Sequence, residues 1–174
     1  AVLRSALDVT VRRFPSIAVR LRRGAFWYYL EQIPKAPPIE EERSYPLVHV
    51  PFDDVRKCAF RVIVYRERIA VEFFHAVTDG TGGLIFLKTL VAEYLCQKYG
   101  VQIPAEYGVL GRLEEPDEEE LEDSFLRYAG DMKASRREAT AWHLSGTPEP
   151  DGFLELTTMM LSVEQVKACA KEYH

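Results

Sequence analysis

The feature that most constrains this chain is a histidine placed between an apolar strand and a glycine-rich turn. Residues 69–75 form an apolar segment whose period of two predicts a β-strand that ends at His75. Asp79 and Gly80 follow as a turn signal, and a strongly apolar helix is predicted over 83–99. His75 is therefore expected where the strand opens into a loop. An imidazole exchanges protons near neutral pH, so this position suits acid–base chemistry.

The remaining hydrophobic patterns predict further helices and strands. Expected helices span 1–14, 83–99 and 162–173, with a shorter one within 121–139. Expected strands span 16–23, 25–32, 57–66, 69–75 and 152–161. One hairpin turns at Gly24, and another joins 57–66 to the strand of His75. Gly100 marks a helix end and Ser162 a capped helix start. The fold class expected is α/β, a two-layer sandwich with a mixed, mostly antiparallel sheet and helices packed on one face.

Two segments lack a periodic pattern and are expected to be loops. Residues 33–54 contain five prolines and are expected to cross the surface in extended form, with brief pairing at 48–50. Residues 101–120 are expected to form a solvated, weakly ordered acidic loop, because eight acidic side chains lie within 114–123. The 27 acidic residues less these eight leave 19, against 22 lysines and arginines. The rest of the chain is thus slightly basic, which is compatible with an anionic co-substrate.

Composition and residue spacing exclude several classes of function. The 174 residues, 47% hydrophobic and 28% charged, are typical of one globular domain. No basic stripe interleaved with aromatic side chains indicates nucleic-acid binding, and no apolar run of about 18 residues predicts a membrane span. With no signal peptide, the three widely spaced cysteines are expected to be reduced core thiols of a cytoplasmic protein. They are Cys58, Cys96 and Cys169. No metal site is expected, because His49, His143 and His174 lack ligand spacing.

The stretch His75-Ala76-Val77-Thr78-Asp79-Gly80, at a strand end and ahead of a helix, resembles the signature of the chloramphenicol-acetyltransferase-like superfamily. That superfamily includes nonribosomal peptide condensation domains, plant acyl-CoA transferases and alcohol acetyltransferases. Residues 13–30 resemble the segment that precedes the motif in the alcohol-acetyltransferase-like branch. The resemblance implies that residues 1–174 are the amino-terminal half of an acyltransferase, whose carboxy-terminal half is missing here. This chain alone is then expected to be inactive, and an exposed apolar face is expected to favour a homodimer.

Roles for individual residues also follow from the resemblance. His75 matches a general base that takes a proton from an alcohol or amine as this acceptor attacks the thioester of an acyl-CoA, foremost acetyl-CoA. Acyl-CoA, or a pantetheine thioester, is then a co-substrate, and no bound cofactor is implied. Asp79 matches a structural aspartate that pairs with an arginine, for which Arg61 is expected. Gly80 matches a glycine where a side chain would crowd or strain the site. The sequence does not identify residues that bind CoA.

Direct transfer without an acyl-enzyme is expected, because no suitably placed Cys or Ser accompanies His75. The sequence departs from condensation domains at Phe74, where they carry a first histidine, and at Thr81-Gly82, where they carry Trp-Ser. This favours a free-standing acyltransferase with a small acceptor. Two alternatives remain open: a condensation-type domain acting on carrier-bound thioesters, and a non-catalytic binding module of the same fold. The aromatic residues 26–29 are expected in the core or at a subdomain interface.

Overall fold

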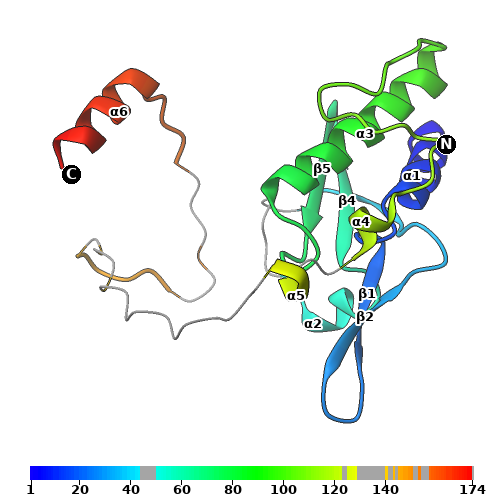
Figure 1. Cartoon of the computed structure of the whole chain (residues 1–174), viewed down its shortest axis with the longest axis horizontal. Helices are drawn as coiled ribbons and strands as arrows, with labels where there is room; N and C mark the ends of the chain where they lie inside the picture. Colours follow the sequence, from blue (N-terminus) through cyan, green and yellow to red (C-terminus); the bar gives the residue numbers. More distant parts are fainter. Residues whose placement is uncertain are drawn as a thin grey trace. The chain divides into compact units, whose positions relative to one another are not determined.

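The chain divides into two compact units, Ala1–Thr140 and Ala141–His174. The computed structural model describes residues 1–43, 50–122, 125–128, 140, 143, 145–150, 153 and 157–173. In the first unit the helices are α1 (Val2–Arg13), α2 (Phe52–Val55), α3 (Gly80–Tyr99), α4 (Glu118–Leu121) and α5 (Phe125–Tyr128). Its strands are β1 (Val19–Arg23), β2 (Tyr28–Gln32), β3 (Ile39–Glu41), β4 (Phe60–Tyr65) and β5 (Arg68–Phe73) (Figure 1).

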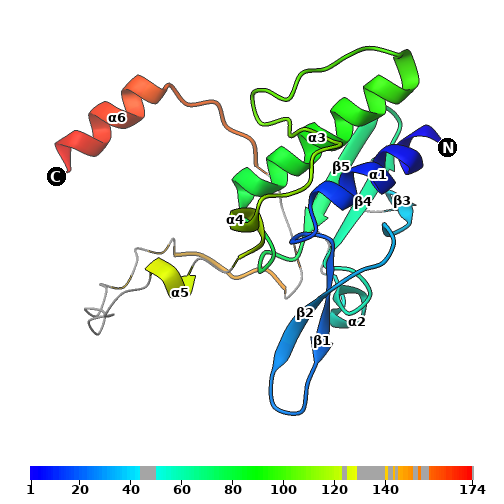
Figure 2. The same cartoon turned by 45° about the vertical axis from the view of Figure 1, so that its right-hand side comes forward.

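The main sheet has the strand order β3-β4-β5. β4 and β5 are antiparallel, with Tyr65 opposite Arg68 across a tight turn, whereas β3 runs parallel to β4. β1 and β2 form a separate antiparallel hairpin, closed by a hydrogen bond from the amide of Gly24 to the carbonyl oxygen of Trp27 (2.7 Å). α1 and α3 lie side by side over the sheet (Figure 2). The predicted two-layer α/β class with a mixed sheet is confirmed.

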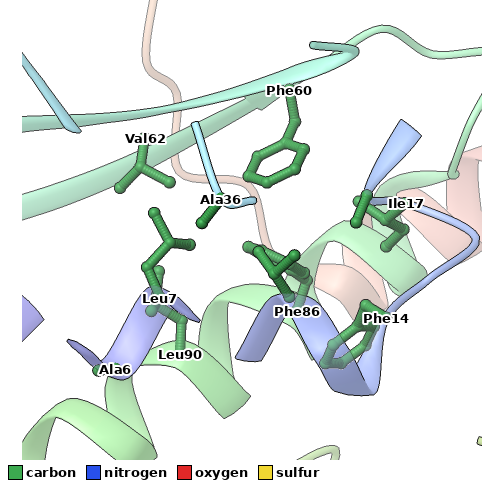
Figure 3. Close-up of a cluster of buried hydrophobic side chains, with 11 residues drawn as sticks. Ala6, Leu7, Phe14, Ile17, Ala36, Phe60, Val62, Phe86 and Leu90 are labelled. Carbon is green, nitrogen blue, oxygen red and sulfur yellow. The ribbon is translucent and has the colours of Figure 1, made fainter. Parts of the chain in front are cut away.

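Phe86 of α3 is the centre of the core that joins the two layers. Its side chain is fully buried, and its ring makes edge contacts with three rings from α1's end, β4 and β5. The ring centroids lie 5.1 Å from Phe14, 5.2 Å from Phe60 and 5.5 Å from Phe73. Figure 3 shows Phe14, Phe60 and Phe86 among the buried side chains. The other buried members of this cluster are Ala6, Leu7, Val11, Ile17, Ala18, Ala36, Val62 and Leu90.

Helix ends follow the local sequence signals. α3 begins three residues earlier than the hydrophobic pattern indicates, because the side chain of Asp79 accepts a hydrogen bond from the amide of Gly82 and caps the helix (2.7 Å). It ends at Gly100, whose φ of 68° lies in the left-handed region that glycine adopts without strain. α1 ends at Arg13, two residues before Pro15.

Two expectations for the amino-terminal part need partial correction: residues 33–54 are not loop throughout, and the aromatic residues 26–29 are not in the core, while their alternative place at a subdomain interface stays a prediction. The proline-rich segment 33–54 contains β3 and α2, which are too short to give a periodic signal; its expected pairing at 48–50 lies largely outside the described residues. The aromatic run is not in the core, since Phe26 and Trp27 at the hairpin tip are 94% and 63% exposed. Tyr28 packs edge-on against Phe52 of α2, with ring centroids 5.7 Å apart.

The middle of the expected acidic loop contacts α3. Residues 101–117 contain no helix or strand, as expected, and Arg112 pairs with Glu93 (2.8 Å) while the amide of Leu110 donates to the hydroxyl oxygen of Thr89 (3.1 Å). The ammonium of Lys88 donates to the carbonyl oxygen of Tyr107 (2.9 Å). These contacts hold residues 107–112 against α3, and the weak order expected of the loop stays a prediction.

The second unit contains α6 (Val163–Glu172), the predicted carboxy-terminal helix. The hydroxyl oxygen of Ser162 accepts a hydrogen bond from the amide of Gln165, which confirms the predicted cap (3.4 Å). The strand expected over 152–161 is not found at its described positions, 153 and 157–161. Cys169 is exposed, so it is not a core thiol. No helix in the described part of the chain is long and apolar enough to cross a membrane.

A salt bridge fixes α4 to α1. Arg13, only 6% exposed, donates both terminal nitrogens of its guanidinium to the carboxylate of Glu120, which is 37% exposed. The hydrogen bond from Arg13 and its positive charge lower the pKa of Glu120 below its ordinary value. The pKa of Glu120 is lower in the folded chain than in the unfolded chain. The pair therefore contributes its whole stabilisation at pH values above the pKa of the unfolded chain. This stability is lost as pH falls through the folded pKa.

Glu120→Gln is expected to lower the free energy of unfolding at pH 7 by about 1 kcal/mol, because solvent screens a partly exposed pair. Urea unfolding, monitored by circular dichroism at pH 3 to 7, measures the difference in free energy of unfolding between the wild-type protein and the variant. This difference should become smaller as pH falls below the ordinary pKa of a glutamate. The matched control is Glu119→Gln, the exposed neighbour on α4, which should leave stability unchanged. A Glu120→Gln difference that does not depend on pH would contradict the role of this ion pair.

Candidate functional site

His75 lies in a turn that hydrogen bonds hold at both ends. Before it, the amide of Phe74 donates to the carbonyl oxygen of Ala59 beside β4 (2.7 Å). After it, the amide of Val77 donates to the carbonyl oxygen of Phe74 (3.0 Å), which closes a β-turn with His75 at its second position. The amide of Gly83 then donates to the carbonyl oxygen of Asp79 and starts α3 (2.9 Å). The prediction that His75 stands where the strand opens into a braced loop is confirmed.

The His75 side chain is exposed, and no described residue forms a hydrogen bond with its imidazole. A general base is commonly oriented by a hydrogen bond at its second ring nitrogen. The described part of the chain therefore positions the backbone of His75 firmly and supplies no group that fixes its tautomer.

Asp79 lies at the start of α3, and the role that the resemblance implies for it stays a prediction. Its carboxylate caps α3. Arg61 of β4 instead donates its Nε to the carboxylate of Glu72, directly opposite on β5 (2.6 Å). The expected Asp79–Arg61 pair is therefore wrong. Arg61 and Glu72 face each other across neighbouring strands, on the side of the sheet away from α1 and α3. Glu72 is therefore a nearer partner for Arg61 than Asp79, which lies beyond the turn that follows β5.

Two cavities meet at His75. The first, here called the open-face cavity, lies on the side of the sheet away from α1 and α3 and has a volume of about 580 Å³. Its lining includes Pro38, Glu40, Phe52, Val55, Arg61 and Phe74. The second, here called the edge cavity, lies between β5 and the start of α3 and has a volume of about 510 Å³. Its lining includes Val71, Thr78, Asp79, Gly80, Leu84 and Leu87.

Four residues line both cavities: Val50, Glu72, Phe73 and His75. His75 is the residue among them whose side chain can accept and release a proton near neutral pH. His75 therefore belongs to the lining of both cavities.

Cys58 also lines the open-face cavity, which the sequence did not indicate. Burial raises the pKa of its thiol, opposed by a hydrogen bond with the backbone of Phe60. A raised pKa keeps the sulfur protonated at neutral pH, and the thiol is a much weaker nucleophile than the thiolate.

Two glycines that follow the motif are closely packed, whereas Gly80 is not. A Cβ atom added at Gly80 would meet no heavy atom of the described chain within 4 Å, and the crowding that the resemblance implies there stays a prediction. A Cβ at Gly83 would lie 3.0 Å from the Phe73 ring, and one at Gly82 would clash with the hydroxyl of Thr78. Close packing is therefore at Gly82 and Gly83, on the first turn of α3.

The structure describes one further histidine. His143 is exposed in the second unit, whereas His49 and His174 lie outside the described residues. Within the described ranges, no three His, Cys, Asp or Glu side chains come together as metal ligands would.

No family model and no curated protein matches this sequence. Among solved structures, the chain is similar to the SgcC5 protein from Streptomyces globisporus, solved in complex with (R)-(-)-1-(2-naphthyl)-1,2-ethanediol and sucrose. The two share 20% sequence identity over 59% of this chain and 28% of SgcC5, with a TM-score of 0.43. Similarity at that level does not establish a family.

Gly83→Ala is expected to be less stable than Gly80→Ala by about 1 to 3 kcal/mol. The added methyl group at position 83 forces the Phe73 ring to move, and that ring is confined by its contacts with Phe60 and Phe86. Both variants gain similar helix propensity, so the comparison isolates crowding. Urea unfolding of the two variants measures the difference. Equal stabilities would mean that the contact of Gly83 with Phe73 does not constrain the site.

Proposed function

We propose that this chain carries the general base of an acyltransferase, and that His75 is this base. The observation that supports the proposal is the position of His75, on a braced turn in the shared lining of two cavities. A bimolecular acyl transfer needs two substrates held on either side of one proton-accepting group. The resemblance of residues 75–80 to an acyltransferase signature points to the same chemistry.

In the proposed reaction an acyl-CoA thioester, foremost acetyl-CoA, lies in one cavity and an alcohol or amine in the other. The imidazole of His75 takes the acceptor's proton as its oxygen or nitrogen bonds to the thioester carbonyl carbon. The carbon–sulfur bond then breaks, and the leaving sulfur takes the proton back from the imidazolium. The products are an ester or amide and the free thiol of CoA, and His75 returns to its starting state.

Transfer is direct in this proposal. The described cavity lining offers Cys58 as a nucleophile, but its buried, protonated thiol does not favour an acyl-enzyme. Phe74 and Thr81-Gly82 still favour a free-standing acyltransferase over a condensation-type domain acting on carrier-bound thioesters.

A non-catalytic binding module is the second candidate. It is favoured by one observation, that no described residue orients the imidazole of His75. A module of this kind would bind its ligands in the same cavities without turnover.

His75→Ala is expected to lower turnover by about 10²- to 10⁴-fold, the usual contribution of a general base. The assay follows thiol release from acetyl-CoA with a panel of alcohols and amines, in the longer two-half protein of which we propose this chain is the amino-terminal part. The 174-residue chain alone is expected to show no turnover. The matched control is His143→Ala, an exposed histidine of the second unit, which should leave the rate unchanged.

Equal rates in the wild-type protein and His75→Ala would contradict the catalytic assignment. Binding of acetyl-CoA without turnover, in both proteins, would favour the non-catalytic module. Turnover with carrier-bound thioesters but not with acetyl-CoA would favour the condensation-type reading.

A further inference from the structure

The open-face cavity has an apolar interior whose polar side chains are largely paired with one another. Its apolar lining includes Pro38, Val50, Phe52, Val55 and Phe74. Its volume of about 580 Å³ falls within the range of roughly 300 to 1,000 Å³ that is usual for pockets of drug-sized ligands. A cavity of this size and lining gains free energy by burying an apolar ligand.

Four polar side chains of this cavity are paired with one another, Arg61 with Glu72 (2.6 Å) and Lys57 with Asp54 (2.7 Å). Glu40 and His75 also line it and are exposed. A sugar or polyol that lies against the apolar side chains would leave its hydroxyl groups there without partners, which costs free energy for each group. An acceptor with a single polar end avoids this cost.

The lining of the edge cavity contains both apolar and polar side chains. It combines Leu84 and Leu87 with Thr78, Asp79 and Gly80 at the start of α3. It therefore offers polar atoms to a ligand with several amide groups, such as the pantetheine arm of a thioester.

We propose that the open-face cavity binds the acceptor, and that the acceptor is an alcohol or amine with a bulky apolar body whose polar end points at His75. This inference rests on the proposed acyl transfer and adds the substrate class. The thioester then occupies the edge cavity, so the two substrates reach the imidazole from different sides.

A homologous series of primary alcohols from ethanol to octanol tests the inference, with acetyl-CoA as donor and the longer two-half protein as enzyme. kcat/KM is expected to rise with chain length by up to about fourfold per methylene group, the ratio that corresponds to about 0.8 kcal/mol. Glycerol is expected to be a poorer acceptor than hexanol.

Glu40→Trp is designed to fill the cavity. Glu40 lies opposite Ile63 in the sheet, faces the cavity and is exposed, so an aromatic residue there fits the strand at small cost. It is expected to remove most of the dependence of kcat/KM on the chain length of the alcohol. The matched control is Glu41→Trp, the next residue on β3, which is exposed and does not line the cavity.

A kcat/KM that does not change with chain length, or that falls equally in both tryptophan variants, would overturn the inference and leave the role of His75 intact. If no alcohol or amine is turned over, the proposed function fails, and binding of octanol measured by saturation-transfer NMR tests the cavity by itself. Octanol binding that is lost in Glu40→Trp and kept in Glu41→Trp supports the cavity assignment. Absence of octanol binding overturns it.

Discussion

The packing of the Phe86 ring determines where the candidate site lies. This one side chain contacts the end of α1, the start of β4 and the end of β5, and so joins the helix layer to the sheet. Phe73 is the last residue of β5 and lies two positions before His75, while Gly83 on the first turn of α3 packs against the Phe73 ring. The turn of His75 therefore connects β5 to α3, and the aromatic core fixes the distance between these two elements.

The hairpin of β1 and β2 also supports the candidate site, through its contacts with α2 and with the start of β4. Tyr28 packs against Phe52, and α2 forms part of the open-face cavity. The amide of Ala59 donates to the carbonyl oxygen of Val19, which joins the start of β4 to the hairpin (2.8 Å). The exposed aromatic tip therefore belongs to an element that also supports the cavity wall.

Local signals in the sequence predicted the strand before His75, the helix after it with its glycine end, and, in the second unit, the cap at Ser162. Each of these depends on residues close together in the chain, so pattern and spacing define them. What the sequence did not predict depends on distant residues. Arg13 and Glu120 are 107 positions apart in the chain, and β3 is a three-residue strand that only its neighbour β4 defines.

The cavities show the same limit of prediction. The motif alone makes His75 a candidate, but the two cavities beside it are lined by residues from 37–40, 50–61 and 71–87, which no local pattern relates. The Arg61–Glu72 pair depends on the register of β4 and β5, and the close packing at Gly83 depends on the position of the Phe73 ring.

The central claim is that His75 meets two ligands in two different cavities. The most direct measurement is NMR of the isotopically labelled protein during separate titrations with acetyl-CoA and with hexanol. The account predicts that both ligands shift the His75 resonances, that hexanol shifts residues 52–61, and that acetyl-CoA shifts residues 78–87. Shifts from both ligands confined to one of these segments, or a His75 that responds to neither ligand, would contradict it.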